Sequence, residues 1–203
     1  MRILSCGESA LLVELADLDE VLGYYAALAA DPPPGVVDLV PAARTVMAAI
    51  DPSVTSLTAL EKMLRATNPR LDRRTDGELV EIPVVYDGED LPEVAELLGC
   101  SAQEVVLRHT SDEWTVAFCG FAPGFGYLTS TGDWDIPRRG TPRTKVPPGS
   151  IALAGEFSGI YPRESPGGWQ LIGRTALAVF DLHREPAALL RPGVRVRFRE
   201  VDA

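Results

Sequence analysis

The chain has 203 residues and a formal net charge of −10, with 46% hydrophobic and 24% charged residues. These proportions are typical of a water-soluble globular protein, and no apolar run approaches the roughly 20 residues that a membrane-spanning helix needs. An acidic chain is also a poor match for nucleic acid, which selects extended basic surfaces. The first residues reach an acid at once, without the basic and then apolar layout of a secretory signal. We therefore expect a cytoplasmic protein that binds neither membranes nor nucleic acid.

The three cysteines, Cys6, Cys100 and Cys119, are odd in number and widely spaced, and the chain has only two histidines. This pattern argues against a disulfide framework and against a zinc site, because both need paired or clustered ligands. We expect reduced thiols and no metal site. Cys119 lies in an apolar stretch without a cationic neighbour, which predicts a buried, unreactive thiol.

The first part of the chain alternates between strand and helix patterns. Residues 2–6, 10–15, 36–40 and 45–50 have the composition of strands, and helical repeats begin at Asp17 and near Thr55. The order ββαββα predicts a small antiparallel sheet covered on one face by two helices. A polar, aperiodic stretch follows at residues 69–78. We place a domain boundary there, which gives domains 1–76 and 77–203.

The second part begins with a strand pattern at residues 79–86 that is interrupted by Pro83, so an edge strand or a bulge is expected. Two short helices follow, for which Asp90 with Glu93 and Ser101 with Glu104 are the predicted capping pairs. Two further strands are predicted at the end of the chain, over 176–182 and 194–201. Many short strands with helices only at the front predict a β-barrel or sandwich. The fold class is therefore α+β.

A loop-rich region between Gly120 and Gly173 holds 11 of the 18 glycines and 7 of the 17 prolines. Residues 114–175 also carry six Lys or Arg against four acids, although the whole chain is acidic. A locally basic, turn-rich stretch with several aromatic side chains predicts a pocket for a small anionic ligand. The alternative is a β-barrel whose turns and surface arginines bind nothing.

Several residues in this region are open to two interpretations. Arg138 and Arg143 are interpreted either as a clamp for a carboxylate or phosphate, which we favour, or as partners in surface ion pairs. His109 is either a general base or a cation that caps the end of its helix. The stretch Pro166–Trp169 either cradles a ligand with its backbone or forms a tight turn around a buried tryptophan. The predicted substrate- or nucleotide-binding residues are Phe121, Phe125, Tyr127, Arg138, Arg143, Tyr161, Gly167, Gly168, Trp169 and Gln170.

Several ordered motifs resemble one family. They are Gly-Phe-Ala-Pro-Gly-Phe-Gly-Tyr-Leu at 120–128, Val-Pro-Pro-Gly-Ser at 146–150 and Pro-Gly-Gly-Trp-Gln-Leu-Ile-Gly at 166–173. The family is known as allophanate hydrolase subunit 1 or as the B-type subunit of 5-oxoprolinase, and it includes a sporulation kinase inhibitor. Ser158 stands where the family often has threonine, and Lys145 is not part of the pattern, which weakens any role for Lys145.

The resemblance implies a small α/β N-terminal domain and a cyclophilin-like β-barrel. It also implies that the chain acts only with a partner, the C-type subunit of 5-oxoprolinase, which is also called allophanate hydrolase subunit 2. With a third 5-oxoprolinase protein, such a complex opens 5-oxoproline to glutamate at the expense of ATP. The sequence itself has no phosphate-binding loop, so ATP would be held unconventionally or by the partner. Two alternatives are a carboxyltransferase-like component of a urea or allophanate pathway and a non-enzymatic inhibitor of a histidine kinase.

Overall fold

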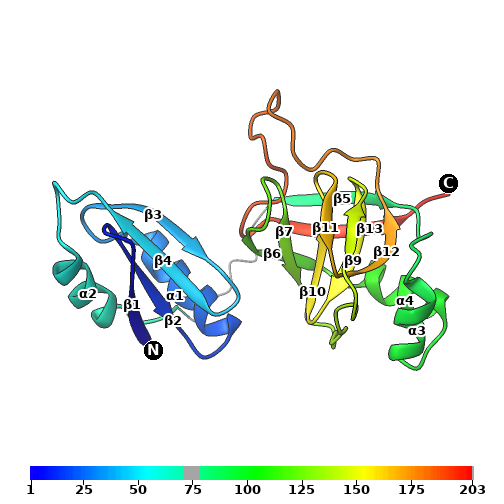
Figure 1. Cartoon of the computed structure of the whole chain (residues 1–203), viewed down its shortest axis with the longest axis horizontal. Coiled ribbons are helices and arrows are strands. Elements are labelled where there is room, and N and C mark those ends of the chain that lie inside the picture. Colours follow the sequence, from blue (N-terminus) through cyan, green and yellow to red (C-terminus); the bar gives the residue numbers. More distant parts are fainter. Residues whose placement is uncertain (71–77, 203) are drawn as a thin grey trace. The chain divides into compact units, whose positions relative to one another are not determined.

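The computed structural model describes residues 1–70 and 78–202, which form two compact units, Met1–Arg74 and Thr75–Ala203 (Figure 1). The predicted boundary between residues 76 and 77 lies outside the described residues. Each unit has its own hydrophobic core. The α+β class predicted from the sequence is confirmed.

The N-terminal unit is a four-stranded antiparallel sheet with two helices on one face. Its strands lie in the order β1 (Arg2–Cys6), β2 (Ala10–Glu14), β4 (Thr45–Ile50) and β3 (Val36–Pro41). Helices α1 (Leu18–Ala30) and α2 (Leu57–Ala66) share a single core with the inward residues of β2 and β4. The Tyr24 hydroxyl donates a hydrogen bond to the Leu64 carbonyl oxygen at 2.6 Å, which links the two helices. The predicted order ββαββα is confirmed.

The C-terminal unit is a seven-stranded sheet that curls until its two end strands almost meet. The order is β12 (Gln170–Arg174), β9 (Ser150–Ala154), β10 (Phe157–Ile160), β7 (Gly126–Thr129), β6 (Trp114–Cys119), β13 (Arg195–Glu200) and β5 (Leu79–Val84). Just beyond β5, Val85 exchanges two backbone hydrogen bonds of 2.9 Å with Arg174 of β12. A two-stranded ribbon, β8 (Arg143–Val146) with β11 (Ser165–Gly167), completes the strands described. The result is a nearly closed barrel, as expected.

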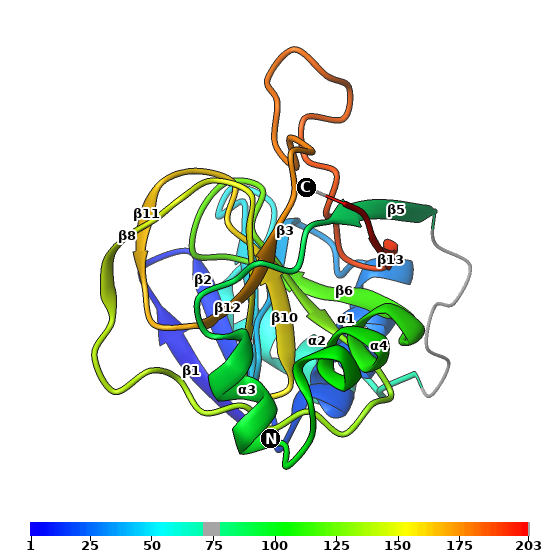
Figure 2. The ribbon, with the colours of Figure 1, turned by 90° about the vertical axis from the view of Figure 1, so that its right-hand side faces the viewer.

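Helices α3 (Leu91–Leu97) and α4 (Ala102–Ser111) lie side by side in this unit (Figure 2). Helix α4 begins with the predicted capping box, in which Ser101 and Glu104 bond each other's backbone N–H groups. Helix α3 is present, but the predicted capping pair of Asp90 with Glu93 is not formed. Asp90 stands at its N-cap position without a side-chain cap bond, because its carboxylate is used elsewhere in the fold. Pro83 lies in β5, which is an edge strand as predicted.

The strand predicted over residues 176–182 is wrong. This segment is irregular and makes one isolated bridge, between Phe180 and Ala188. Its apolar residues serve a different purpose: Val179 is buried in the barrel core, and Phe180 packs against Gly124. The apolar composition corresponds to burial only in part, because Leu182 is 80% exposed, and the side chains that are covered pack against the barrel without pairing in a strand.

Candidate functional site

The five aromatic residues that the sequence predicts as pocket walls lie together, and we call them the aromatic cluster. Phe125 is at its centre, with ring centroids 5.3 Å from Phe121, 5.1 Å from Tyr127, and 5.4 Å from both Tyr161 and Trp169. These pairs are all edge-to-face, the geometry that aromatic quadrupoles favour. Phe125, Tyr161 and Trp169 are buried, whereas Phe121 is exposed. The cluster is therefore a rigid wall with one ring at its rim.

The glycines predicted beside this wall are explained by close packing. A Cβ atom at Gly167 would overlap the Tyr161 hydroxyl, so only glycine fits there. Gly167 also pairs with Arg143 across the β8–β11 ribbon, and the Gly168 carbonyl oxygen accepts a hydrogen bond of 2.8 Å from the Arg139 N–H. The two glycines thus join the wall to the basic segment 138–143.

Arg138 extends from this segment into solvent beside the cluster. Burial raises the pKa of the Tyr127 and Tyr161 phenols. The positive charge of Arg138 lowers the pKa of both, because its guanidinium lies near them. Within the described residues Arg138 makes no ion pair with a carboxylate. Its charge is therefore available to a ligand.

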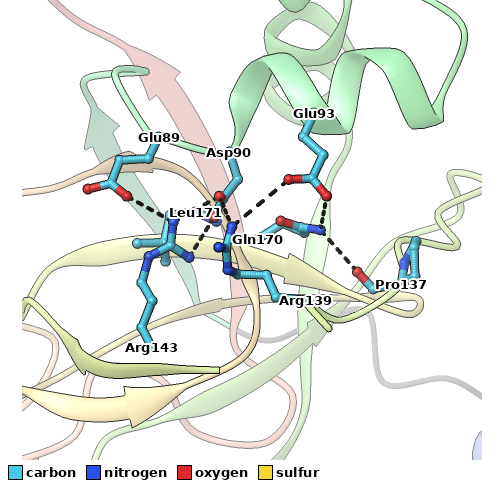
Figure 3. A network of polar contacts seen from close by, with 8 residues as sticks. All are labelled: Glu89, Asp90, Glu93, Pro137, Arg139, Arg143, Gln170 and Leu171. Atoms are coloured by element: carbon cyan, nitrogen blue, oxygen red, sulfur yellow. Dashed lines mark hydrogen bonds and ion pairs between the residues drawn. The ribbon is translucent and has the colours of Figure 1, made fainter. Parts of the chain in front are cut away.

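Arg143 has the opposite environment. Its Nη1 donates to Asp90 Oδ2 and its Nη2 to Asp90 Oδ1, both at 2.8 Å, and Nη2 also reaches Glu89 Oε2 at 2.9 Å (Figure 3). This is the two-pronged geometry of a strong arginine–carboxylate pair. Arg139 binds the same Asp90 carboxylate from a second direction (Figure 3). The two arginines of the predicted clamp therefore differ, because the Arg143 guanidinium already binds a carboxylate of its own chain and, in the part of the chain that the structure describes, the Arg138 guanidinium does not.

Asp90 lies at the centre of this network and binds Arg139, Arg143 and the Leu171 N–H. The sequence did not identify this role. Only 3% of the residue is exposed, and its Oδ2 also accepts a hydrogen bond of 2.7 Å from the Leu171 N–H in β12. Burial alone would raise the pKa of Asp90. The hydrogen bonds from Arg143 and Leu171, together with the charges of both arginines, outweigh burial and lower the pKa below its usual value. Asp90 is therefore a carboxylate that fixes α3, β12 and the basic segment to one another.

Gln170 is buried at the edge of the same network. Its Nε2 donates to Glu93 Oε1 at 3.3 Å and to the Pro137 carbonyl oxygen at 3.4 Å (Figure 3). Its Oε1 has no hydrogen-bond partner among the described residues, and neither does the Nε atom of Arg139. Gln170 therefore links helix α3 to the start of the basic segment through its buried amide.

His109 lies in the barrel core. It is fully buried, stacks on Phe198 with ring centroids 4.2 Å apart, and both ring nitrogens contact hydroxyls: Nδ1 lies 2.7 Å from Tyr86 Oη and Nε2 lies 3.0 Å from Ser158 Oγ. Burial lowers its pKa to about 3, so the ring is neutral at physiological pH. It then accepts a hydrogen bond from one hydroxyl and donates one to the other.

Strand β10 separates His109 from the aromatic cluster. Neighbouring residues of a strand point to opposite faces of the sheet. Ser158 faces the core, where it meets His109, whereas a Cβ at the next residue, Gly159, would lie 2.8 Å from the Phe125 ring. A general base at His109 would have to reach a ligand through the sheet, so the geometry favours a structural role. The interpretation as a helix cap does not fit either, because the ring is neutral.

We expect the burial of His109 to make stability depend on pH in a defined window. The unfolded histidine binds a proton below pH 6.5 and the folded one only near pH 3, so stability falls as the pH is lowered through this range. The loss attributable to His109 is about 2 kcal/mol between pH 7 and pH 5. Denaturant unfolding at several pH values should show this slope in the wild type and not in His109→Gln. If His109→Gln instead keeps its stability profile but abolishes turnover of the assembled enzyme, the catalytic interpretation is restored.

A cavity of about 280 Å³ lies next to the aromatic cluster and is lined by Pro148, Gly149, Tyr161, Thr175 and the segment 176–180, among others.

Cys119 is half-buried, and its thiol donates a hydrogen bond to the Leu190 carbonyl oxygen at 3.3 Å. Burial raises the pKa of the thiol to about 11, so the protonated form predominates, in line with the predicted low reactivity. In the described part of the chain, no group of three His, Cys, Asp or Glu side chains is placed to hold a metal ion. Residues 1–70 and 78–202 also contain no helix long and apolar enough to cross a bilayer.

Residues 1–190 match the family described as carboxyltransferase domain, subdomain C and D. The chain is 42% identical over 170 residues to the B subunit of 5-oxoprolinase from Escherichia coli O157:H7, which covers 81% of this chain and 78% of that protein. It is 36% identical, over an alignment of 224 positions, to the B subunit of 5-oxoprolinase from Bacillus subtilis strain 168, covering 99% and 93% of the two proteins.

Two solved structures share the fold. TTHA0988 is 39% identical, with a TM-score of 0.77 over 96% of this chain. The present chain spans only 40% of the length of that protein. The urea amidolyase of Kluyveromyces lactis has a TM-score of 0.76 over 98% of this chain and 15% of its own, but at 19% identity it demonstrates a common fold and nothing more.

Proposed function

This chain belongs to the carboxyltransferase domain family, subdomains C and D, and we propose that it is the B-type subunit of an ATP-dependent 5-oxoprolinase, a complex that opens 5-oxoproline to glutamate. The observation that carries the proposal is identity of 42% and 36% to two proteins of that name, over 81% and 99% of the chain. The aromatic cluster, and the Arg138 charge that no described carboxylate neutralises, support the same substrate class.

The substrate has two features that the site complements. 5-Oxoproline is a small, nearly flat lactam ring with one carboxylate. Three rings of the aromatic cluster are buried, but the exposed Phe121 and the half-buried Tyr127 offer ring faces and edges against which a flat ring packs favourably. Arg138 lies near the Tyr127 and Tyr161 phenols of that cluster. We propose that Arg138 binds the carboxylate while the cluster orients the ring.

Neither of the two reactive groups that the sequence singled out, His109 and Cys119, is placed to serve a hydrolytic site. A hydrolytic site needs a nucleophile or an activated water, a base and a group that orients the base. Among the described residues, His109 is enclosed in the core and the Cys119 thiol is protonated, so neither meets the requirement. We therefore propose that the C-type subunit and the third 5-oxoprolinase protein provide the reacting groups. We propose that ATP, bound with the partner, would supply a phosphoryl group to the lactam oxygen with release of ADP. Addition of water to the activated carbon would then be followed by loss of phosphate and by cleavage of the ring C–N bond, with the nitrogen taking up a proton, to give glutamate.

The purified chain alone is expected to show no 5-oxoprolinase turnover. Mixing it with the C-type subunit, the third protein, ATP and 5-oxoproline is expected to give glutamate, ADP and phosphate in equal amounts. The measurement is amino-acid analysis coupled to an ADP assay, with each protein omitted in turn. Turnover by the single chain would contradict the proposal that the partner proteins provide the reacting groups. A reconstituted mixture that releases no glutamate, but consumes urea in the presence of a biotin carrier, would favour the carboxyltransferase alternative.

A further inference from the structure

Arg138 follows two residues that are fixed to the barrel. Ile136 is buried and exchanges two backbone hydrogen bonds with Gly155, of 3.0 Å and 2.6 Å. The ring of Pro137 restricts its own φ, and its carbonyl oxygen accepts a hydrogen bond from the buried Gln170 amide (Figure 3). That carbonyl belongs to the peptide unit that joins Pro137 to Arg138. The Gln170 amide therefore holds the main chain directly before Arg138.

The residue after Arg138 is fixed as well. The Arg139 N–H donates to the Gly168 carbonyl oxygen at 2.8 Å, and the Arg139 guanidinium pairs with the buried Asp90 carboxylate (Figure 3). Arg138 is thus an exposed residue between two anchored neighbours. Because both of its flanking peptide units are held, the fold sets the position of its Cα atom, and mainly its side-chain torsions remain free.

Gln170 connects this anchored main chain to the aromatic cluster. It directly follows Trp169, whose ring centroid lies 5.5 Å from that of Tyr127. The Gln170 side chain points away from the cluster to the network of Figure 3, where its Nε2 atom carries two hydrogens and serves two acceptors at once. One of these acceptors is the Pro137 carbonyl oxygen, at 3.4 Å. A single residue therefore joins the wall of the cluster to the backbone that carries Arg138.

We propose that Gln170 is a positioning residue for substrate binding: through the Pro137 carbonyl oxygen it holds Arg138 beside the aromatic cluster, where Arg138 binds the substrate carboxylate. This inference rests on the proposed function. It assigns Gln170 the support of a binding residue, in place of the direct contact with substrate that the sequence suggested. Such support fits an amide that belongs to a residue only 1% exposed.

The electrostatics of the cluster agree with this placement of Arg138. Burial raises the pKa of the Tyr127 and Tyr161 phenols, and the charge of Arg138 lowers the pKa of both. A charge in solvent is strongly screened, so its effect on the two phenols depends on how closely the guanidinium is held to them. The two phenols therefore report on the position of Arg138 in the absence of substrate.

The first test is the steady-state kinetics of the reconstituted complex carrying Gln170→Met. Methionine keeps the length of the side chain and the net charge but removes the Nε2 donor. The KM for 5-oxoproline is expected to rise about 2- to 10-fold with kcat unchanged, because the hydrogen bond that holds the main chain before Arg138 is lost. In the Arg138→Ala background, the same replacement is expected to leave KM where Arg138→Ala puts it.

The matched control is Ser158→Ala. Ser158 is also a buried hydrogen-bonding residue of the C-terminal unit, but its hydroxyl lies 3.0 Å from His109 Nε2 in the barrel core. Its replacement is expected to lower Tm and to leave KM unchanged. A general loss of folded protein reduces the apparent kcat and not KM, so this control separates positioning from stability.

A second variant, Pro137→Gly, loosens the same main chain from the exposed side. Pro137 is exposed, so its replacement leaves the core intact, and glycine removes the restriction on φ directly before Arg138. The KM for 5-oxoproline is expected to rise about 2- to 5-fold, within the contribution of one weak interaction. This variant keeps the test decisive if Gln170→Met does not fold.

A further measurement needs no turnover. The full chain is labelled with ring-fluorinated tyrosine, and the Tyr127 and Tyr161 phenols are titrated by fluorine NMR, with each signal assigned by its Tyr→Phe variant. Arg138→Ala is expected to raise the pKa of both phenols, because it removes the positive charge. Gln170→Met is expected to raise the same two pKa values by part of that shift, and Ser158→Ala is expected to leave them unchanged.

Phenol pKa values that stay at their wild-type positions in Gln170→Met, while they rise in Arg138→Ala, would overturn this inference alone. An equal rise of KM on Gln170→Met with and without Arg138 would overturn it too. Absence of 5-oxoproline turnover in the wild-type mixture would instead contradict the proposed function, and the titration would then decide by itself whether Gln170 positions Arg138.

Discussion

Replacing Asp90 by alanine is expected to lower the free energy of unfolding of the C-terminal unit by about 3–5 kcal/mol. Asp90 is buried, and its carboxylate neutralises Arg139 and Arg143 while it accepts the Leu171 N–H. Removal of the carboxylate leaves the two largely covered arginines with only the exposed Glu89 and Glu93 near them and leaves the Leu171 N–H without its acceptor, which costs more than the pair itself contributes. The measurement is urea unfolding followed by tryptophan fluorescence. All three tryptophans lie between residues 114 and 169, so the signal reports on this unit.

The matched control is Glu89→Gln. Glu89 also contacts Arg143, but its side chain is 78% exposed, so its loss is expected to cost less than about 1 kcal/mol.

The contribution of Asp90 to stability is expected to depend on pH. Because the folded-state pKa of Asp90 is lowered, its stabilisation is complete above the unfolded pKa, about 3.9, and is lost as the pH falls below it. Arg143→Ala is expected to destabilise the same unit, and the double variant with Asp90→Ala should cost less than the sum. Additive losses would show that the network is not a coupled unit.

Replacing Arg138 by alanine is expected to raise the KM for 5-oxoproline in the assembled complex roughly 10- to 150-fold, because a charge-assisted hydrogen bond contributes about 1.5–3 kcal/mol. The fold is expected to be unaffected, since Arg138 is exposed and makes no ion pair with the described residues. Arg138→Lys should restore part of the affinity, because lysine keeps the charge but loses the planar two-pronged donor geometry. The measurement is steady-state kinetics of the reconstituted enzyme, with fluorescence-detected unfolding alongside.

Lys145→Ala is the charge-matched control for Arg138. Lys145 lies in the same basic region, but it is 74% exposed at the side chain and pairs with Glu164 at 3.2 Å. Its replacement removes one positive charge from the same region without touching the aromatic cluster. A KM that changes equally in both variants would point to the general positive field of the region and against a specific contact by Arg138. An unchanged KM in Arg138→Ala would remove Arg138 from the site.

The sequence alone predicted most of the fold, because the signals involved are local. Alternation of apolar residues and helix caps such as Ser101 with Glu104 act over a few residues, and the structure has the strands and helices that they indicate. The aromatic cluster was also predictable, since strand and turn motifs placed its members in one loop-rich region. The strand expected over 176–182 was wrong because an apolar composition does not by itself specify pairing with a strand: Val179 packs into the core, whereas Leu182 is exposed.

The roles of the charged and titratable residues were decided by tertiary structure alone. Arg138 and Arg143 are equivalent in the sequence, yet one extends into solvent and the other meets Asp90, a residue 53 positions earlier. His109 lies in the core, where β10 separates it from the cluster. The charge state and availability of such groups depend on burial and on partners distant in the chain, and these exist only after folding. The sequence placed the aromatic and basic residues in one region, and the fold determined which of their side chains are exposed and which are already paired.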